Sequence, residues 1–138
     1  MSFRAAPGER LMERIVVRIN ATELGMTTRD TPTAEAILKE LPLQAVAQTW
    51  GEEVYFRVPV SAALEDDARD VVEKGEIAFW TGGSAIAIGY GRTPASRGDE
   101  IRLVTAVNVW ADADGDPADL REVRDGDPVW IGLARDAD

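Results

Sequence analysis

The sequence predicts a mainly β protein that forms a closed or nearly closed eight-stranded antiparallel barrel with two short helices. Short runs of alternating apolar and polar residues recur along the chain, and clusters of Gly, Pro, Asn or Asp separate them. Two stretches carry the start and stop signals of helices, and both are short. Closure into a barrel is the usual way to bury about eight short strands without exposed edges.

The clearest element is a hairpin predicted over residues 75–94, with the sequence GEIAFWTGGSAIAIGYGRTP. A Gly-Gly pair between two β-rich runs predicts a two-residue turn, because both glycines can adopt positive φ. We therefore expect Gly82-Gly83 to form the tip of this hairpin. The resulting register pairs Trp80 with Ala85, Phe79 with Ile86, Ala78 with Ala87 and Ile77 with Ile88.

Alternation along the two strands of this hairpin predicts two different faces. The core face holds Ile77, Phe79, Ile86 and Ile88. The opposite, outer face holds the large indole of Trp80 beside Ala78, Ala85, Ala87 and Gly89. An aromatic ring beside such small residues is either a seat for another element or an open groove.

The chain begins with an expected flexible tail over residues 1–10, and residues 11–138 are expected to form a single domain. A strand is predicted over residues 11–19, and a turn at Asn20-Ala21 leads into a shorter partner over residues 23–28. These two strands form a first hairpin.

A short helix follows, with Thr31 as its N-cap, Pro32 at its first position and Pro42 preventing its continuation. The run 43–50 alternates as a strand, and a return strand begins at residue 53. The return strand is expected to send Val54, Phe56 and Val58 inward and Glu53, Tyr55 and Arg57 outward.

The polar, acidic stretch 61–76 is predicted to be a loop with a helical turn, and residues 92–98 form a second loop. An apolar strand or strand pair is expected over residues 101–110. Asp116 and Pro117 then predict the cap and first position of a second short helix. The run PVWIGLA near the end of the chain predicts the last strand.

Adjacent carboxylates occur at Glu52-Glu53 and over residues 65–67, and we expect them to be solvated surface charge rather than acid and base partners. The acidic run 112–116 places its glycine wrongly for a calcium loop and is expected to cap the second helix.

The composition argues against several classes of function. The formal net charge of −10 comes from 15 Lys and Arg against 25 Asp and Glu, and it disfavours nucleic acid and anionic membranes as partners. The chain has no Cys and no His, so thiolate and imidazole chemistry is excluded, and we expect no metal and no cofactor. The sequence offers neither an apolar run of membrane-spanning length nor a secretory leader, and we expect a cytoplasmic protein.

The order of the predicted elements resembles the cyclophilin fold, an eight-stranded antiparallel barrel with a helix near each end. Three segments carry the resemblance: Pro32-Thr33-Ala34-Glu35 at the first helix, the run 75–88, and Val107-Asn108-Val109-Trp110 before the second helix. The runs WGEEVYF, GEIAFW and GDPVWI resemble the small bacterial and archaeal cyclophilin-like proteins of no established activity. The resemblance extends from Ile15 to Leu133.

The sequence departs from the prolyl isomerases of this family at positions that contact substrate. Ala85 and Ala87 stand where those enzymes present Gln and Phe, and no His precedes Val107. Arg57 is the nearest candidate for the arginine that the resemblance leads us to expect. Prolyl isomerase activity is therefore expected to be weak or absent.

The function expected from these observations is binding of a peptide segment or small molecule on the outer face of the central hairpin, by a monomer or homodimer. The candidate site comprises Tyr55, Arg57, Ala78, Trp80, Ala85 and Ala87. A covering loop or a second subunit over Trp80 is the alternative occupant of this face. Two other functions stay open: a prolyl isomerase with a rearranged site, and a component of an enzyme that processes small amides, since some such enzymes use cyclophilin-like domains.

Overall fold

The computed structural model describes residues 12–137, and the tail expected over residues 1–10 lies outside them. Within the described residues it has ten strands, one α-helix and two 3₁₀ segments. The strands are β1 (Arg14–Ile19), β2 (Thr22–Thr28), β3 (Leu43–Val46), β4 (Gln48–Thr49), β5 (Glu53–Arg57), β6 (Arg69–Val72), β7 (Glu76–Trp80), β8 (Ala85–Gly89), β9 (Ile101–Ala113) and β10 (Pro128–Leu133). The helical segments are α1 (Pro32–Glu40), η1 (Pro117–Glu122) and η2 (Ala134–Asp136).

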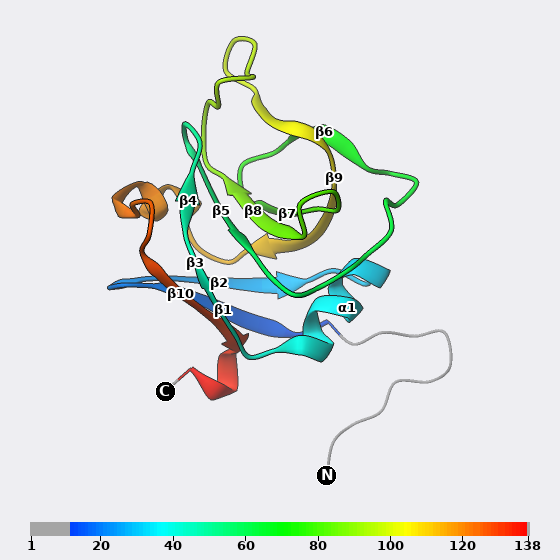
Figure 1. Cartoon of the computed structure of the whole chain (residues 1–138), viewed down its shortest axis with the longest axis vertical. Helices are drawn as coiled ribbons and strands as arrows, with labels where there is room; N and C mark the ends of the chain where they lie inside the picture. The colour runs from blue at the N-terminus through cyan, green and yellow to red at the C-terminus, as the bar shows by residue number, and fades with distance from the viewer. Residues whose placement is uncertain (1–11, 138) are drawn as a thin grey trace.

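The sheet curls into a nearly closed antiparallel barrel (Figure 1). Its strands follow the order β3-β10-β1-β2-β9-β7-β8-β5-β4, and β6 pairs with β9 beside this path. β3 and β4 lie at the two ends of the order, yet only Ala47 separates them along the chain. The two ends of the sheet therefore meet in one stretch of chain, which confirms the mainly β, nearly closed barrel.

The number of strands differs from the eight expected for two reasons. The strand predicted over residues 43–50 is interrupted at Ala47, where the chain changes partner from β10 to β5. The Ala47 N–H donates to the Asp127 carbonyl, and the Ala47 carbonyl accepts from the Gly126 N–H. In addition, β6 forms inside the stretch 61–76 that was predicted to be a loop.

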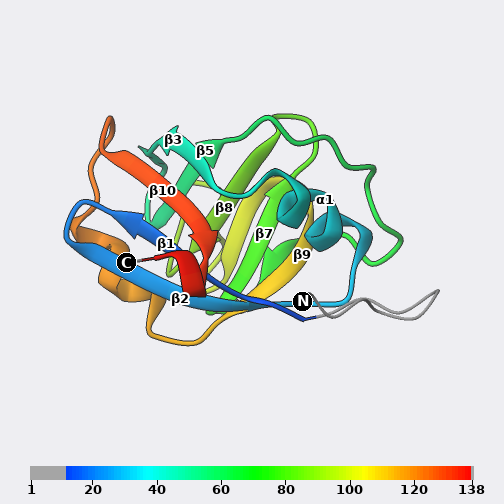
Figure 2. The same ribbon diagram turned by 90° about the horizontal axis from the view of Figure 1, so that it is seen from below.

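α1 and η1 lie at opposite ends of the barrel (Figures 1 and 2), where η1 is drawn in orange. The Thr31 hydroxyl accepts from the Ala34 N–H at 3.0 Å, which confirms the predicted N-cap of α1. Asp116 likewise caps η1 through the Ala118 N–H at 2.9 Å, although this second helix is 3₁₀ rather than α. None of the described helices is long and apolar enough to cross a membrane.

The barrel interior confirms the register predicted for the central hairpin. β7 and β8 pair Ile77 with Ile88, Ala78 with Ala87, Phe79 with Ile86 and Trp80 with Ala85. The four large side chains of the core face are completely buried in the main core. They pack there with residues of β1, β2, β5, β10 and α1.

A second, smaller core lies on the outer face of β7 and β8. The first half of β9 pairs with β6. Side chains of these two strands cover Ala78 and Ala87, namely Val72, Ile101, Leu103 and Val107. A Cβ at Gly89 would lie 2.5 Å from Ile101 Cγ2, so the glycine is what admits this close approach. Over these alanines the outer face is therefore a seat for another element and not an open groove.

Two arginines, one on β6 and one just after β2, fix Glu76, the first residue of β7, to its neighbours. Arg69 of β6 and Arg29, just after β2, both bond Glu76 Oε2, at 2.6 and 3.0 Å. The hydrogen bond from Arg69 is the main cause that lowers the pKa of Glu76 to about 2. Arg29 also pairs with Asp112 of β9 at 2.7 Å. This network holds β6 against the barrel and thus helps to position the second core.

Candidate ligand-binding site

A pocket of about 180 Å³ opens on the outer wall of the barrel beside the second core. Its lining comes from three strands and one turn, and comprises Trp50, Glu53, Tyr55, Trp80 and Val104. Trp50 lies in the turn between β4 and β5, while Glu53 and Tyr55 belong to β5, Trp80 to β7 and Val104 to β9.

Glu53 is the buried polar group of this pocket. Glu53 is only 6% exposed, and its Oε1 has no hydrogen-bond partner among residues 12–137. Burial raises the pKa of Glu53 to about 7. The expectation of a solvated carboxylate is therefore wrong, because the chain folds back at Gly51 (φ 61°) and the Trp50 N–H bonds the Glu53 carbonyl at 3.0 Å.

Trp80 is held by the turn that follows it. The strands end at Trp80 and resume at Ala85, so the turn has four residues instead of the two expected. Positive φ occurs at Ser84 (49°) and not at either glycine. Gly83 is needed for packing, since a Cβ there would lie 2.3 Å from Trp80 Cε3.

Arg57 lies next to this indole but outside the pocket. Its guanidinium carbon is 5.6 Å from the centroid of the Trp80 ring, a cation–π contact. Arg57 Nη1 also donates to the Gly83 carbonyl at 2.8 Å. The side chain thus fastens β5 to the β7–β8 turn and limits the freedom of Trp80.

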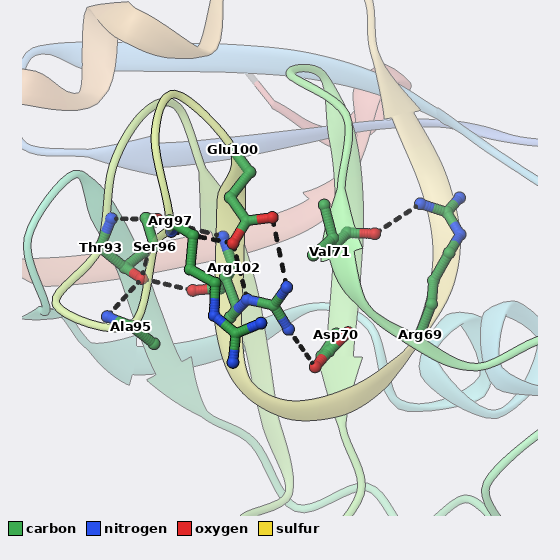
Figure 3. Close-up of polar contacts among 9 residues, drawn as sticks. All are labelled: Arg69, Asp70, Val71, Thr93, Ala95, Ser96, Arg97, Glu100 and Arg102. Carbon is green, nitrogen blue, oxygen red and sulfur yellow. Dashed lines mark hydrogen bonds and ion pairs between the residues drawn. The ribbon is translucent and has the colours of Figure 1, made fainter.

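The wall that carries Val104 is stabilised by a polar cluster at the start of β9 (Figure 3). Arg102 bonds Glu100 at 2.7 Å and Asp70 of β6 at 2.6 Å, and its contact with Glu100 holds the pKa of that carboxyl below its usual range. The Thr93 hydroxyl donates to the Arg102 carbonyl, and the Thr93 N–H donates to Ser96 Oγ at 2.9 Å. Together these contacts tie the loop before β9 to β6 and β9.

The sequence of this barrel matches a known protein family. The sequence model of the cyclophilin-like family matches residues 13–132 of the chain. The chain belongs to the cyclophilin-like family. This confirms the resemblance drawn from the order of the sequence segments.

A solved relative of this cyclophilin-like protein is the hypothetical protein AF2241 from Archaeoglobus fulgidus, whose solution structure is known. The two chains share 34% sequence identity with a TM-score of 0.79, over 92% of this chain and 99% of the relative. No curated protein matches this cyclophilin-like chain.

The structure separates the six expected site residues into two groups. Tyr55 and Trp80 line the pocket and Arg57 adjoins it. The three alanines, Ala78, Ala85 and Ala87, are buried beneath other residues and present almost no surface. In this cyclophilin-like barrel the alanines are thus part of the buried packing, and the accessible pocket lies to one side of them.

The sequence reasoning missed Trp50, Glu53 and Val104 as lining residues. Glu53 shares its outward direction with Tyr55 and Arg57 along β5, and this alternation was a usable signal. No comparable signal marks Val104, because its place depends on how the first half of β9 pairs with β6.

Three aromatic side chains and one buried carboxylate give the pocket its chemistry. The rings provide flat surfaces for stacking, and Glu53 provides a single polar anchor of either protonation state near neutral pH. No group of three or more His, Cys, Asp or Glu residues in the described part of the chain is arranged to hold a metal ion. The arrangement suits non-covalent recognition of a small group.

Proposed function

We propose that this cyclophilin-like domain binds a small molecule or one side chain of a peptide segment in the pocket beside Trp80. The proposal rests on Glu53 Oε1, which has no hydrogen-bond partner within the part of the chain that the structure describes. A buried polar atom without a hydrogen bond is destabilising and uncommon in folded proteins, and at a functional site a ligand supplies the missing partner.

The size of the pocket supports a small occupant. Sites for drug-sized ligands measure roughly 300–1,000 Å³, whereas this pocket measures about 180 Å³. A group of side-chain size fills such a volume. The rest of a longer ligand would lie on the surface outside, near Val104 and Arg57.

The test uses a Trp80→Ala variant and a panel of small polar fragments observed by NMR. Fragments that shift the indole N–H signal of Trp80 in the wild type should bind the variant more weakly by about 2 kcal/mol or more, as for an aromatic hot spot. Because Trp80 also packs against the second core, the melting temperature should fall by no more than it does for Trp130→Ala.

Trp130→Ala is the matched control, because Trp130 is also half-buried beneath an arginine, with Arg18 at 5.4 Å from its ring, but it lies in a different hollow. Equal weakening by both variants would contradict the proposal. A drop in melting temperature much larger than that of Trp130→Ala, or a concentration-dependent mass for Trp80→Ala, would instead assign the indole to an internal or subunit contact.

Prolyl isomerase activity is the second candidate, and we expect it to be weak or absent. Catalysis needs a hydrogen-bond donor directed at the proline nitrogen, and the guanidinium of Arg57 is engaged with the Gly83 carbonyl and Trp80. A proline-isomerisation assay on a short peptide checks this expectation. An ordinary isomerase rate that is lost on Arg57→Ala would overturn it.

A further inference from the structure

We infer that the pocket selects an organic cation, an alkylammonium or guanidinium head group, with Glu53 as its counter-ion and aromatic rings as its walls. The inference deepens the proposed function and rests on it. It follows from the charge of the lining residues, the burial of the Glu53 carboxyl and the volume of the pocket.

The described lining residues include one carboxylic acid and no basic side chain. The faces of aromatic rings carry partial negative charge and attract cations, most strongly when water is excluded. Two indoles and a phenol therefore act in the same direction as Glu53. An anionic ligand would be repelled by the ionised Glu53 carboxylate and by the ring faces, and the net charge of −10 adds to this repulsion at long range.

A buried carboxylate is usually paired with a cation or fully hydrogen-bonded, and Glu53 is neither within the described residues. Burial alone raises its pKa, and no cation among residues 12–137 lowers it. An ammonium or guanidinium group in the pocket would donate charge-assisted hydrogen bonds to Oε1, which are about twice as strong as bonds between neutral groups. A cation consequently gains more from this carboxyl than a neutral donor does.

Arg57 does not take this role itself. It is exposed, lies outside the lining, and bonds the Gly83 carbonyl. Its contact with Trp80 does show that this indole accepts a guanidinium at cation–π distance. The Glu53 carboxyl is left for a cation that comes from outside the described chain.

The test measures binding of three probes of similar size to the full chain at about pH 7.5 by NMR titration of the indole N–H signals. The probes are n-butylammonium, neutral 1-butanol and anionic butyrate. We expect n-butylammonium to bind at least about tenfold more tightly than 1-butanol, and butyrate not to bind. This preference should disappear in Glu53→Gln.

Glu52→Gln is the matched control, because it removes the same charge from the preceding residue, which is exposed and does not line the pocket. It should keep the preference for the cation. A fourth probe, Nα-acetyl-lysine N-methylamide, distinguishes the source of the cation: tighter binding than n-butylammonium assigns a peptide lysine, and equal or weaker binding assigns a free amine.

Two outcomes overturn the inference, and they differ in what they say of the proposed function. If 1-butanol binds as tightly as n-butylammonium, or if Glu53→Gln keeps the preference, selection of a cation is refuted while binding in the pocket stands. If no probe shifts the Trp80 signal, the proposed function fails with it.

Discussion

Phe79→Ala is expected to lower the free energy of unfolding by roughly 3–5 kcal/mol, the range measured when a fully buried Phe is truncated in a well-packed core. Phe79 is 0% exposed and lies between Ile86 of β8 and Asn108 of β9 in the barrel wall. Its ring belongs to the main core, where the nearly closed sheet leaves neighbouring residues little room to fill a cavity. Urea denaturation followed by circular dichroism at neutral pH measures the change.

Leu64→Ala is the control for this experiment, because Leu64 is a large apolar residue that is 54% exposed. Its truncation should change the free energy of unfolding by no more than about 0.5 kcal/mol. A loss below about 1 kcal/mol for Phe79→Ala would contradict the register of β7, since the side chain would then not lie in a packed core.

Glu53→Gln is expected to stabilise the ligand-free protein at about pH 8 by up to about 3 kcal/mol, at 1.36 kcal/mol for each unit of pKa difference. The pKa of Glu53 is about 7 in the folded protein against 4.5 as its ordinary value. Between these two values the folded state binds more protons than the unfolded state, so the stability of the wild type falls as the pH rises through this window. The glutamine has no charge to desolvate and escapes this loss.

Denaturation of the wild type and variant at about pH 5 and about pH 8 provides the measurement. The advantage of Glu53→Gln should be large at the higher pH and small at the lower. Glu76 does not interfere, because its lowered pKa of about 2 confines its effect on stability to pH values below 4.5. Glu52→Gln should show no such dependence, and an equal gain for both variants, or none for Glu53→Gln, would refute a buried, uncompensated carboxyl.

The two expected effects of Glu53→Gln have opposite signs: the fold becomes more stable, and the preference for a cation is lost. Such a trade between stability and activity is typical of functional sites. A residue present only for the fold would not be expected to behave in this way. Measuring both properties on one variant therefore tests whether the Glu53 carboxyl is present for binding.

Local sequence signals predicted those parts of the fold that depend on neighbours along the chain. Alternation around Gly82-Gly83 gave the correct pairing of Trp80 with Ala85, and Thr31 and Asp116 were correctly identified as caps. The predicted length of the turn was wrong, because neither glycine adopts positive φ, and Gly83 instead makes room for the indole of Trp80.

The parts that the sequence did not reveal depend on contacts between distant segments. β6 is a four-residue strand in an acidic stretch, and it forms because the first half of β9 pairs with it. The burial of Glu53 depends on the turn at Gly51 and on walls from β7 and β9. Local alternation indicated the outward direction of this side chain, but not that other residues would enclose it.

The position of β10 has a consequence for how the protein folds. β10 is the last strand along the chain, yet it lies between β1 and β3, which are complete by residue 46. A growing polypeptide on the ribosome therefore cannot finish the barrel until this final strand emerges, and until then β1 and β3 each expose an unpaired backbone edge to other chains. Because the last step joins segments so far apart in sequence, we expect folding to be slow for a domain of this size.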